Sequence, residues 1–379
     1  MRKLVVFPND PILAYYKKGE IKARYFNPGN YFDEVHFIST CYEEVKPDRV
    51  QELVGDAKLE IHTVGTFSKI RKPWLFFTHR QRVLELVKNI APSASRGFNL
   101  RYGGYLAAYC ARELGIPSLI SLHADYSRWR NFRILGRDYI PWPLIYSLMD
   151  YPLERYIIKH ADLIIGAYEY PLKYVKKHRN RGLEVVYNKV YTDRYGLSQK
   201  RKNERPVILS VARQHKGRSP ENLIRAVKDL DVTLLLIGSG ELTPGMKKLA
   251  SELGLSEKVK FIESVPNSQI HEYYLASDIF AISTQYPGIN ITCIEAMAAA
   301  LPVVTSRSLF EKERELVADI AIVVENTHEA FEEAFRRLLA DSQLRKEMGK
   351  KGRKRALEIN GEIMERKEVE LYKQLVEKG

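Results

Sequence analysis

Two arginines, five positions apart, are the first side chains whose type and spacing could do chemistry. Arg213 and Arg218 follow the apolar run 207–211 and precede the helical stretch 222–229. A turn from a strand into a helix directs backbone N–H groups and the positive end of the helix toward a bound anion. Because a guanidinium presents fixed, bidentate donors, this pair could clamp a diphosphate without a metal ion. An ordinary basic loop is the alternative.

A second turn, after the apolar run 232–237, consists of Gly238, Ser239 and Gly240. Small residues allow the backbone to approach a ligand closely. The third glycine of a dinucleotide-binding fingerprint is missing, so the same residues could form only a tight turn.

Segment 283–298 is the densest in residues that could bind a ligand. Glu295 stands at the head of an apolar, alanine-rich stretch that has the composition of a buried helix. A buried carboxylate needs a specific partner, and the two hydroxyls of a ribose would provide one. The alternative is a carboxylate satisfied by the helix dipole and by backbone amides.

His123 directly follows the apolar run 118–122, at the end of a strand where side chains can face a ligand. A histidine at such a place could serve a bound ligand. A single histidine after a strand is more often structural, so the residue by itself leaves both roles open.

The elements that must position these residues are short apolar, β-branched runs that alternate with amphipathic, helix-length stretches, which predicts parallel sheets. In the first half the expected strands are residues 4–7, 35–38, 59–64, 118–122, 163–165 and 185–187. The second half supplies 207–211, 232–237, 259–262, 279–282, 303–305 and 320–324. The expected fold is therefore α/β, with two Rossmann-like, doubly wound parallel-sheet domains.

A polar segment at 198–205, followed by Pro206, separates the two series of strands, and we place the domain boundary there. The predicted domains are residues 1–197 and 198–360. A C-terminal helix at 361–379 carries an apolar stripe and is expected to dock back on the first domain.

Composition is that of a globular protein, with 379 residues, of which 45% are hydrophobic and 28% charged. The sequence has neither a signal-peptide core nor an apolar run of roughly 18 residues, so we expect a cytoplasmic location. Three cysteines, Cys41, Cys110 and Cys293, lie far apart. This spacing disfavours a disulfide framework and a thiolate metal site.

The net charge of +13 is most simply explained by solvation. Basic and aromatic residues mix at 69–77 and 128–142, which predicts contact with an anionic membrane surface, peripheral to its inner face. Nucleic-acid binding is disfavoured because no helix-turn-helix, zinc or single-strand-binding signature accompanies the charge.

In their order along the chain, these segments resemble glycosyltransferase family 4, which consists of retaining enzymes of the GT-B fold with two such domains facing a central cleft. The resemblance covers essentially the whole second half and is looser in the first. The residues that carry it are 211–213 with Arg218, 223–226, 238–240, 253–255, 259–261, 274–278, and 294–298 with 302–304.

This resemblance assigns roles to individual residues. Arg213 and Arg218 match the pair that holds the donor diphosphate, with Arg218 where lysine is usual, and His123 matches a histidine near the reacting sugar. We therefore expect these three to be catalytic. Glu295 matches the second glutamate of an E-x7-E motif, which holds the nucleotide ribose. Further donor-binding residues by this likeness are Gly238, Ser239, Gly240, Val265, Pro266, Asn267, Gly288, Ile289, Asn290 and Ile291.

The activity implied is transfer of a sugar, with retention, from a UDP- or GDP-sugar to a hydroxyl of a glycan or of a lipid-linked acceptor. It requires no metal and no other cofactor. The main departure from the family is Pro287, which stands where the first glutamate of E-x7-E should contact the donor sugar. This departure motivates an alternative, a weakly active or inactive relative that binds a nucleotide or glycan as a partner subunit. A smaller departure is Ala300, at a usual glycine.

Overall fold

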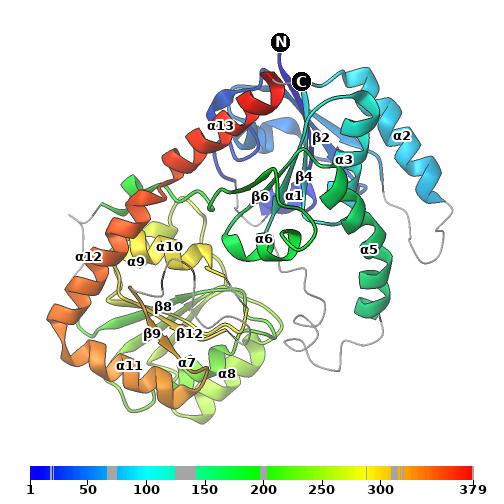
Figure 1. Ribbon diagram of the computed structural model, residues 1–379. Helices are drawn as coiled ribbons and strands as arrows, with labels where there is room; N and C mark the ends of the chain where they lie inside the picture. Colours follow the sequence, from blue (N-terminus) through cyan, green and yellow to red (C-terminus); the bar gives the residue numbers. More distant parts are fainter. Residues whose placement is uncertain are drawn as a thin grey trace. The chain divides into compact units, whose positions relative to one another are not determined.

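The computed structural model describes residues 1–17, 19, 21–65, 75–123, 142–196, 203–286, 288–308, 315, 317 and 320–377, and of residues 142–149 it describes the backbone only. These residues form two compact units (Figure 1). The first contains the described chain up to residue 123, residues 142–187 and the segment from Met364 onward. The second contains Asn188–Ile363.

The first unit is built on a seven-stranded sheet in the order β3-β2-β1-β4-β5-β6-β7, in which all paired neighbours are parallel. Its strands are β1 Lys3–Phe7, β2 Glu34–Ser39, β3 Lys58–Thr63, β4 Ala94–Phe98, β5 Ser118–Leu122, β6 Leu163–Gly166 and β7 Leu183–Val185. The strand order changes direction between β1 and β4. In an open α/β sheet ligands bind beyond the carboxyl ends of the strands at such a point.

Helices cover both faces of this sheet. They are α1 Ile12–Lys17, α2 Leu75–Ile90, α3 Tyr102–Leu114, α5 Trp142–His160, α6 Glu169–Val175 and α13 Gly361–Glu377. Apolar side chains of α2, α3 and α5 share one buried cluster with Val5 and Phe7 of β1. On the other face Tyr372 of α13 is fully buried, with its ring edge-on to Phe32 at 5.0 Å between centroids. The C-terminal segment is thus part of the first unit's core.

Strand β4 is central in this sheet, yet the sequence analysis did not anticipate it. Its sequence, Ala-Ser-Arg-Gly-Phe, has no β-branched residue and places Arg96 in the middle. Arg96 is buried and forms an ion pair with Glu368 of α13, with 2.5 Å between Nη1 and Oε1. Burial lowers the pKa of the guanidinium, but the Glu368 carboxylate together with Tyr372 and Tyr25 raises that pKa overall. The partner that permits this strand comes from the far end of the chain, which local patterns do not reveal.

The second unit has a six-stranded parallel sheet in the order β10-β9-β8-β11-β12-β13. Its strands are β8 Val207–Val211, β9 Thr233–Ile237, β10 Val259–Ile262, β11 Ile279–Ile282, β12 Val303–Ser306 and β13 Ile322–Val324. Its helices are α7 Pro220–Ala226, α8 Thr243–Glu252, α9 Ile270–Leu275, α10 Ile291–Ala298, α11 His328–Ala340 and α12 Ser342–Glu358. Here the direction of winding changes between β8 and β11.

Two parallel, doubly wound sheets confirm the expected fold class. All six strands expected in the second half are present, with ends shifted by at most two residues. In the first half the last strand is β7, at Leu183–Val185 instead of 185–187.

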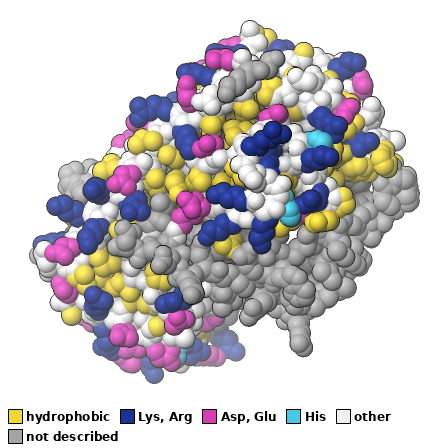
Figure 2. Space-filling model, in the orientation of Figure 1, with side chains coloured by type: hydrophobic (Ala, Val, Ile, Leu, Met, Phe, Trp, Pro, Cys, Tyr) yellow, Lys and Arg dark blue, Asp and Glu magenta, His cyan; other side chains and the backbone are white. Residues whose placement is uncertain are grey.

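None of the described helices has the length and apolar character that would let it span a bilayer. On the visible face Lys and Arg side chains are interspersed with Asp and Glu (Figure 2).

Candidate functional site

Arg218 lies at the point where the second sheet changes its direction of winding. Its Nη2 donates a hydrogen bond of 3.1 Å to Oδ1 of Asn290, which precedes α10. Its Nε and Nη1 are buried and have no hydrogen-bond partner within the described part of the chain. Burial also lowers the pKa of this guanidinium. A desolvated cation with two unused donors is a strong anion-binding group.

The structure brings Arg213 and Arg218 to one small cavity of about 10 Å³ above the end of β8. The side chain of Arg213 is exposed, whereas that of Arg218 reaches inward. Ser210 and Ser283 also line this cavity, from the ends of β8 and β11. The two arginines therefore line the same cavity, one from the surface and one from inside.

The side chain of Gln214 connects the turn between β8 and α7 to the segment that follows β9. This buried side chain donates from Nε2 to the carbonyl of Gly238 at 2.8 Å and accepts from the Thr243 hydroxyl at 2.7 Å. A Cβ added at Gly238 would lie 2.2 Å from the carbonyl oxygen of Ala212, and one at Gly240 would lie 2.1 Å from that of Gln214. These two glycines thus have a packing role, because the turn after β9 lies directly against the turn that carries Arg213.

A polar cluster that sequence reasoning missed fixes the start of α7 beside β11. The hydroxyl of Ser283 donates to Oδ1 of Asn326 at 2.7 Å and accepts from the Ser219 backbone N–H at 3.2 Å. Nδ2 of Asn326 donates to Oγ of Ser219 at 3.2 Å. Asn326 follows β13, more than one hundred residues from Ser219 in sequence. No local pattern could have indicated it.

Glu295 is buried on α10, as its apolar surroundings predicted. Its Oε2 accepts a hydrogen bond of 2.8 Å from the hydroxyl of Tyr274, on α9. Burial raises the pKa of the Tyr274 phenol, which therefore stays protonated and remains a donor. The sequence analysis sought the partner of this carboxylate in a ligand, and the structure supplies a protein partner, Tyr274.

The segment before α10 forms a turn, with Gly288 in the left-handed region at φ +80° and Ile289 buried. The side chain of Asn290 does not cap α10 and bonds Arg218 instead. Ile291 begins the helix. The expected loop at Val265, Pro266 and Asn267 follows β10, so it is separated from β8 by β9. Pro287 lies outside the described residues.

His123 belongs to the first unit, where it follows β5. Its backbone N–H donates to Oδ1 of Asn99 at 3.1 Å, and its carbonyl accepts from the Tyr168 hydroxyl at 3.2 Å. The imidazole is half-buried and stacks on Phe98, with 5.7 Å between ring centroids. Burial, with a contribution from Arg96, lowers the pKa of His123 to about 4. The ring is therefore neutral at pH 7 and can both donate and accept a hydrogen bond.

A second concave feature, which the sequence analysis did not anticipate, lies at the other end of the first sheet. This groove of about 1130 Å³ is formed where α5 leads into β6 and where the chain enters β7. Its described lining contains four Arg or Lys residues, Arg155, Lys159, Arg179 and Arg181, and one acidic residue, Asp162. The expected basic–aromatic contact segments lie mostly outside the described residues, at 69–74 and 128–141, so this groove is a separate basic surface.

Comparison with known sequences concerns mainly the second unit. Residues 197–355 match the family described as glycosyl transferases group 1. A GDP-mannose-dependent alpha-(1-6)-phosphatidylinositol monomannoside mannosyltransferase from Mycolicibacterium smegmatis is 31% identical over 179 residues, which are 44% of this chain and 46% of that protein. An N-acetylgalactosamine-N,N'-diacetylbacillosaminyl-diphospho-undecaprenol 4-alpha-N-acetylgalactosaminyltransferase from Campylobacter jejuni is 30% identical over 183 residues, 46% of this chain and 48% of that protein. The chain thus matches about half the length of these relatives.

Solved structures resemble the chain over its whole length. A glycosyltransferase from Rickettsia africae superposes with a TM-score of 0.73 at 15% identity and covers 100% of this chain and 99% of its own. The Anabaena protein HepE in complex with UDP gives 0.72 at 15% identity, covering 99% of this chain and 100% of its own. At this identity the likeness shows the fold alone. That fold is GT-B, as the sequence analysis expected.

Proposed function

We propose that the chain transfers a sugar from a nucleoside diphosphate sugar to a hydroxyl, with retention of configuration. The premise is the glycosyl transferases group 1 family, to which residues 197–355 belong. The observation that carries the proposal is Arg218. A buried guanidinium with two donors that have no partner among the described residues, next to a second arginine at a sheet switch point, is arranged for a diphosphate.

Arg218 and Arg213 then stabilise the negative charge that develops on the departing diphosphate, without a metal ion. Electrostatic stabilisation of this kind is the largest contribution available to such a site. Glu295 orients the ribose, and the turn from Gly288 to Ile291 borders the donor. Val265, Pro266 and Asn267 border the base.

A UDP- or GDP-sugar is the donor in this proposal. Support comes from the relative described as GDP-mannose-dependent and from the neighbouring fold that was solved with UDP. His123 positions the sugar or the acceptor hydroxyl as a neutral imidazole.

The acceptor we propose is a glycan or a lipid-linked glycan at an anionic membrane surface. The descriptions of two relatives name a phosphatidylinositol mannoside and a diphospho-undecaprenol. In this chain the four cations of the groove supply a surface of the required charge.

Binding of UDP and GDP, measured by calorimetry and by thermal shift, tests the proposal at its first step. Arg218→Ala is expected to weaken binding at least about 30-fold, because removing one partner of a buried, hydrogen-bonded charge pair costs about 2 kcal/mol or more. Arg218→Lys keeps the charge and should retain most of the affinity.

Arg205→Ala is the matched control, since Arg205 lies in the same unit but is exposed and pairs with Asp231 on the surface. Equal affinities of the Arg218→Ala variant and the wild type would contradict the assignment. Transfer or hydrolysis of a panel of nucleotide sugars tests the second step. Tight nucleotide binding without turnover of any sugar nucleotide would favour the partner-subunit alternative.

A further inference from the structure

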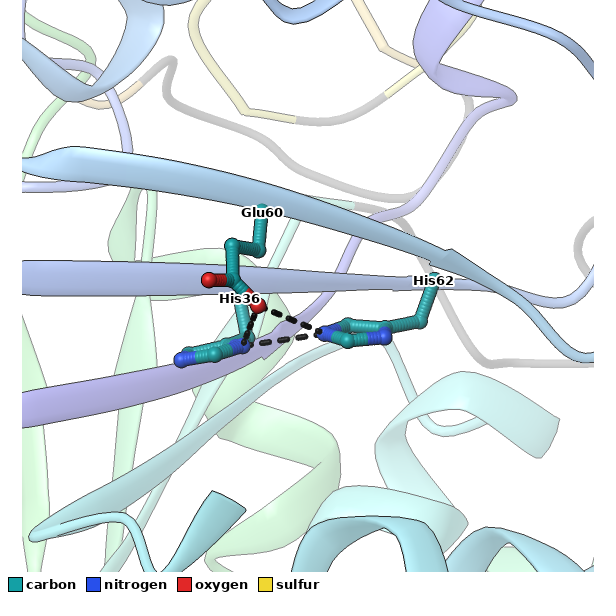
Figure 3. Close-up of side chains that lie close together, drawn as sticks. All are labelled: His36, Glu60 and His62. Carbon is teal, nitrogen blue, oxygen red and sulfur yellow. Dashed lines mark hydrogen bonds and ion pairs between the residues drawn. The ribbon is translucent and has the colours of Figure 1, made fainter.

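Two histidines and a glutamate lie close together on β3, the edge strand of the first unit's sheet, and on its neighbour β2. They are away from the residues discussed so far. His36 is on β2, and Glu60 and His62 are on β3 (Figure 3). In the parallel pairing His36 lies opposite Glu60, and His62 is two positions further along β3. Alternate residues of a strand point to the same face, so all three side chains share one face.

The three ligand atoms form a compact triangle. Nδ1 of His36 lies 2.9 Å from Nε2 of His62, and Oε2 of Glu60 lies 3.6 Å from the first nitrogen and 3.9 Å from the second. The centre of a triangle with these edges is about 2 Å from each corner, which is the length of a Zn–N or Zn–O bond. The side chains therefore need little rearrangement to coordinate an ion.

Neighbouring charges leave the three ligand atoms facing one another. Lys58 forms an ion pair with Oε1 of Glu60, which leaves Oε2 toward the histidines. Nε2 of His36 is buried, lies 3.2 Å from Oε1 of Glu34, and has no aligned hydrogen-bond partner among the described residues. A carboxylate behind the second nitrogen is the usual outer partner of a metal-bound imidazole.

We propose that His36, Glu60 and His62 bind one divalent transition-metal ion, of which Zn²⁺ is the best fit. Two imidazoles with one carboxylate suit such an ion, whereas Mg²⁺ and Ca²⁺ prefer oxygen ligands alone. Three protein ligands leave a position for water. His62 and Glu60 are partly exposed, which gives the ion a path of entry.

The ion would fasten the edge strand β3 to β2. Strand β5, which leads to His123, is separated from β2 by β1 and β4, or about 14 Å at the usual strand spacing. The ion therefore stabilises the first unit and takes no part at His123. The competing explanation is a hydrogen-bonded, stacked histidine pair on an edge strand that its charges protect from association.

Zn²⁺ titration by calorimetry after treatment with EDTA separates the two explanations. The wild type is expected to bind one equivalent. His62→Ala, at the more exposed of the two histidines, should lower the affinity at least about 100-fold, and Glu34→Gln should lower it about 10- to 100-fold through the outer partner. His328→Ala is the matched control, because His328 also lies beside a glutamate, at 3.3 Å from Glu329, in the other unit.

Two outcomes would overturn the proposal. One is a wild type that binds Zn²⁺ no more tightly than the His62→Ala variant. The other comes from X-ray absorption of the Zn²⁺-loaded wild type, which needs no variant and so does not depend on a substituted chain folding. Two imidazole nitrogens around the ion are expected, and a spectrum without histidine ligands would refute the site.

Discussion

At the scale of single residues, burial decides what the candidate site residues can do. Arg213 and Arg218 share one turn. Arg213 is exposed, whereas two of the donor nitrogens of Arg218 are buried. His123 and Glu295 are also withdrawn from solvent, and each touches a protein group that the sequence did not indicate, Phe98 and Tyr274. The environment of each of these side chains, and with it the free energy of its charged form, therefore depends on neighbours from other elements.

His123 should make folding stability depend on pH. Its pKa is lowered to about 4 in the folded protein, whereas an unperturbed histidine titrates near pH 6.5. Between these values the unfolded chain binds a proton that the folded chain does not, so stability is fully present above about pH 6.5 and is lost as the pH falls toward 4. We expect urea unfolding of His123→Asn to show a smaller loss over this range. Parallel pH curves for the variant and the wild type would contradict this.

At the scale of elements, close approaches of backbone determine which substitutions are tolerated. Ala300, where the family usually has glycine, adopts the left-handed conformation at φ +54°, two positions after the end of α10. Its carbonyl lies so near α12 that a Cβ added at Gly349 would be 2.1 Å from it. Helices α10 and α12 thus pack through a glycine, which keeps the helix that carries Glu295 in place.

Two glycine-to-alanine substitutions in helices should have opposite signs. Gly349→Ala gains helix propensity but forces α12 away from Ala300, and we expect a net loss of about 1–3 kcal/mol. Gly245→Ala, on α8, meets no atom within 4 Å and should stabilise by up to about 1 kcal/mol. Denaturant unfolding measures both. A neutral or stabilising Gly349→Ala would show that the two helices can separate without cost.

The attachment of α13 to the first sheet depends on a buried ion pair. Glu368→Ala leaves Arg96 buried without its carboxylate, and we expect a loss of about 3–5 kcal/mol in the free energy of unfolding. Lys367→Ala is the control on the adjacent residue. Its pair with Glu184, at 2.9 Å, is partly exposed, so the loss should stay within about 1 kcal/mol. Equal effects of the two substitutions would mean that burial does not distinguish the pairs.

At the scale of the whole molecule, the chain has two parallel sheets of different strand number, each with its own switch point and its own polar residues there. Residues that the family likeness relates to the donor nucleotide lie in the second unit, and His123 lies in the first. The basic groove is on the first unit, at the amino-terminal ends of β6 and β7. It is therefore at the opposite end of that sheet from His123.

Charge reversal in this groove tests the proposed membrane contact. Lys159→Glu combined with Arg181→Glu should weaken binding to vesicles that contain anionic lipid by at least about 10-fold, since each basic residue near such a surface contributes about 1 kcal/mol. Lys248→Glu is a control at an exposed lysine of α8. Sedimentation with vesicles measures the effect. Loss of binding that is equal for the control, or no binding by the wild type, would count against the groove.

The sequence by itself determined the class of fold and the positions of Arg213, Arg218 and Glu295 on its elements. Strands buried on both faces of a parallel sheet can be predicted from apolar runs, because that pattern is local. For the same reason Arg213 and Arg218 could be placed at the turn after β8. Glu295 could be recognised as a carboxylate in an apolar helix. Each of these features depends on residues within one strand, one turn or one helix.

The tertiary structure decided everything that depends on which elements become neighbours. Strand β4 could not be predicted, because its arginine is stabilised by Glu368, 272 positions away in sequence. The contacts of Asn290 with Arg218 and of Tyr274 with Glu295 arise from strand order, and the triangle of His36, Glu60 and His62 arises from the register of β2 and β3. Burial and register are properties of the packed chain, so they fix charge states and ligand geometry that no local pattern contains.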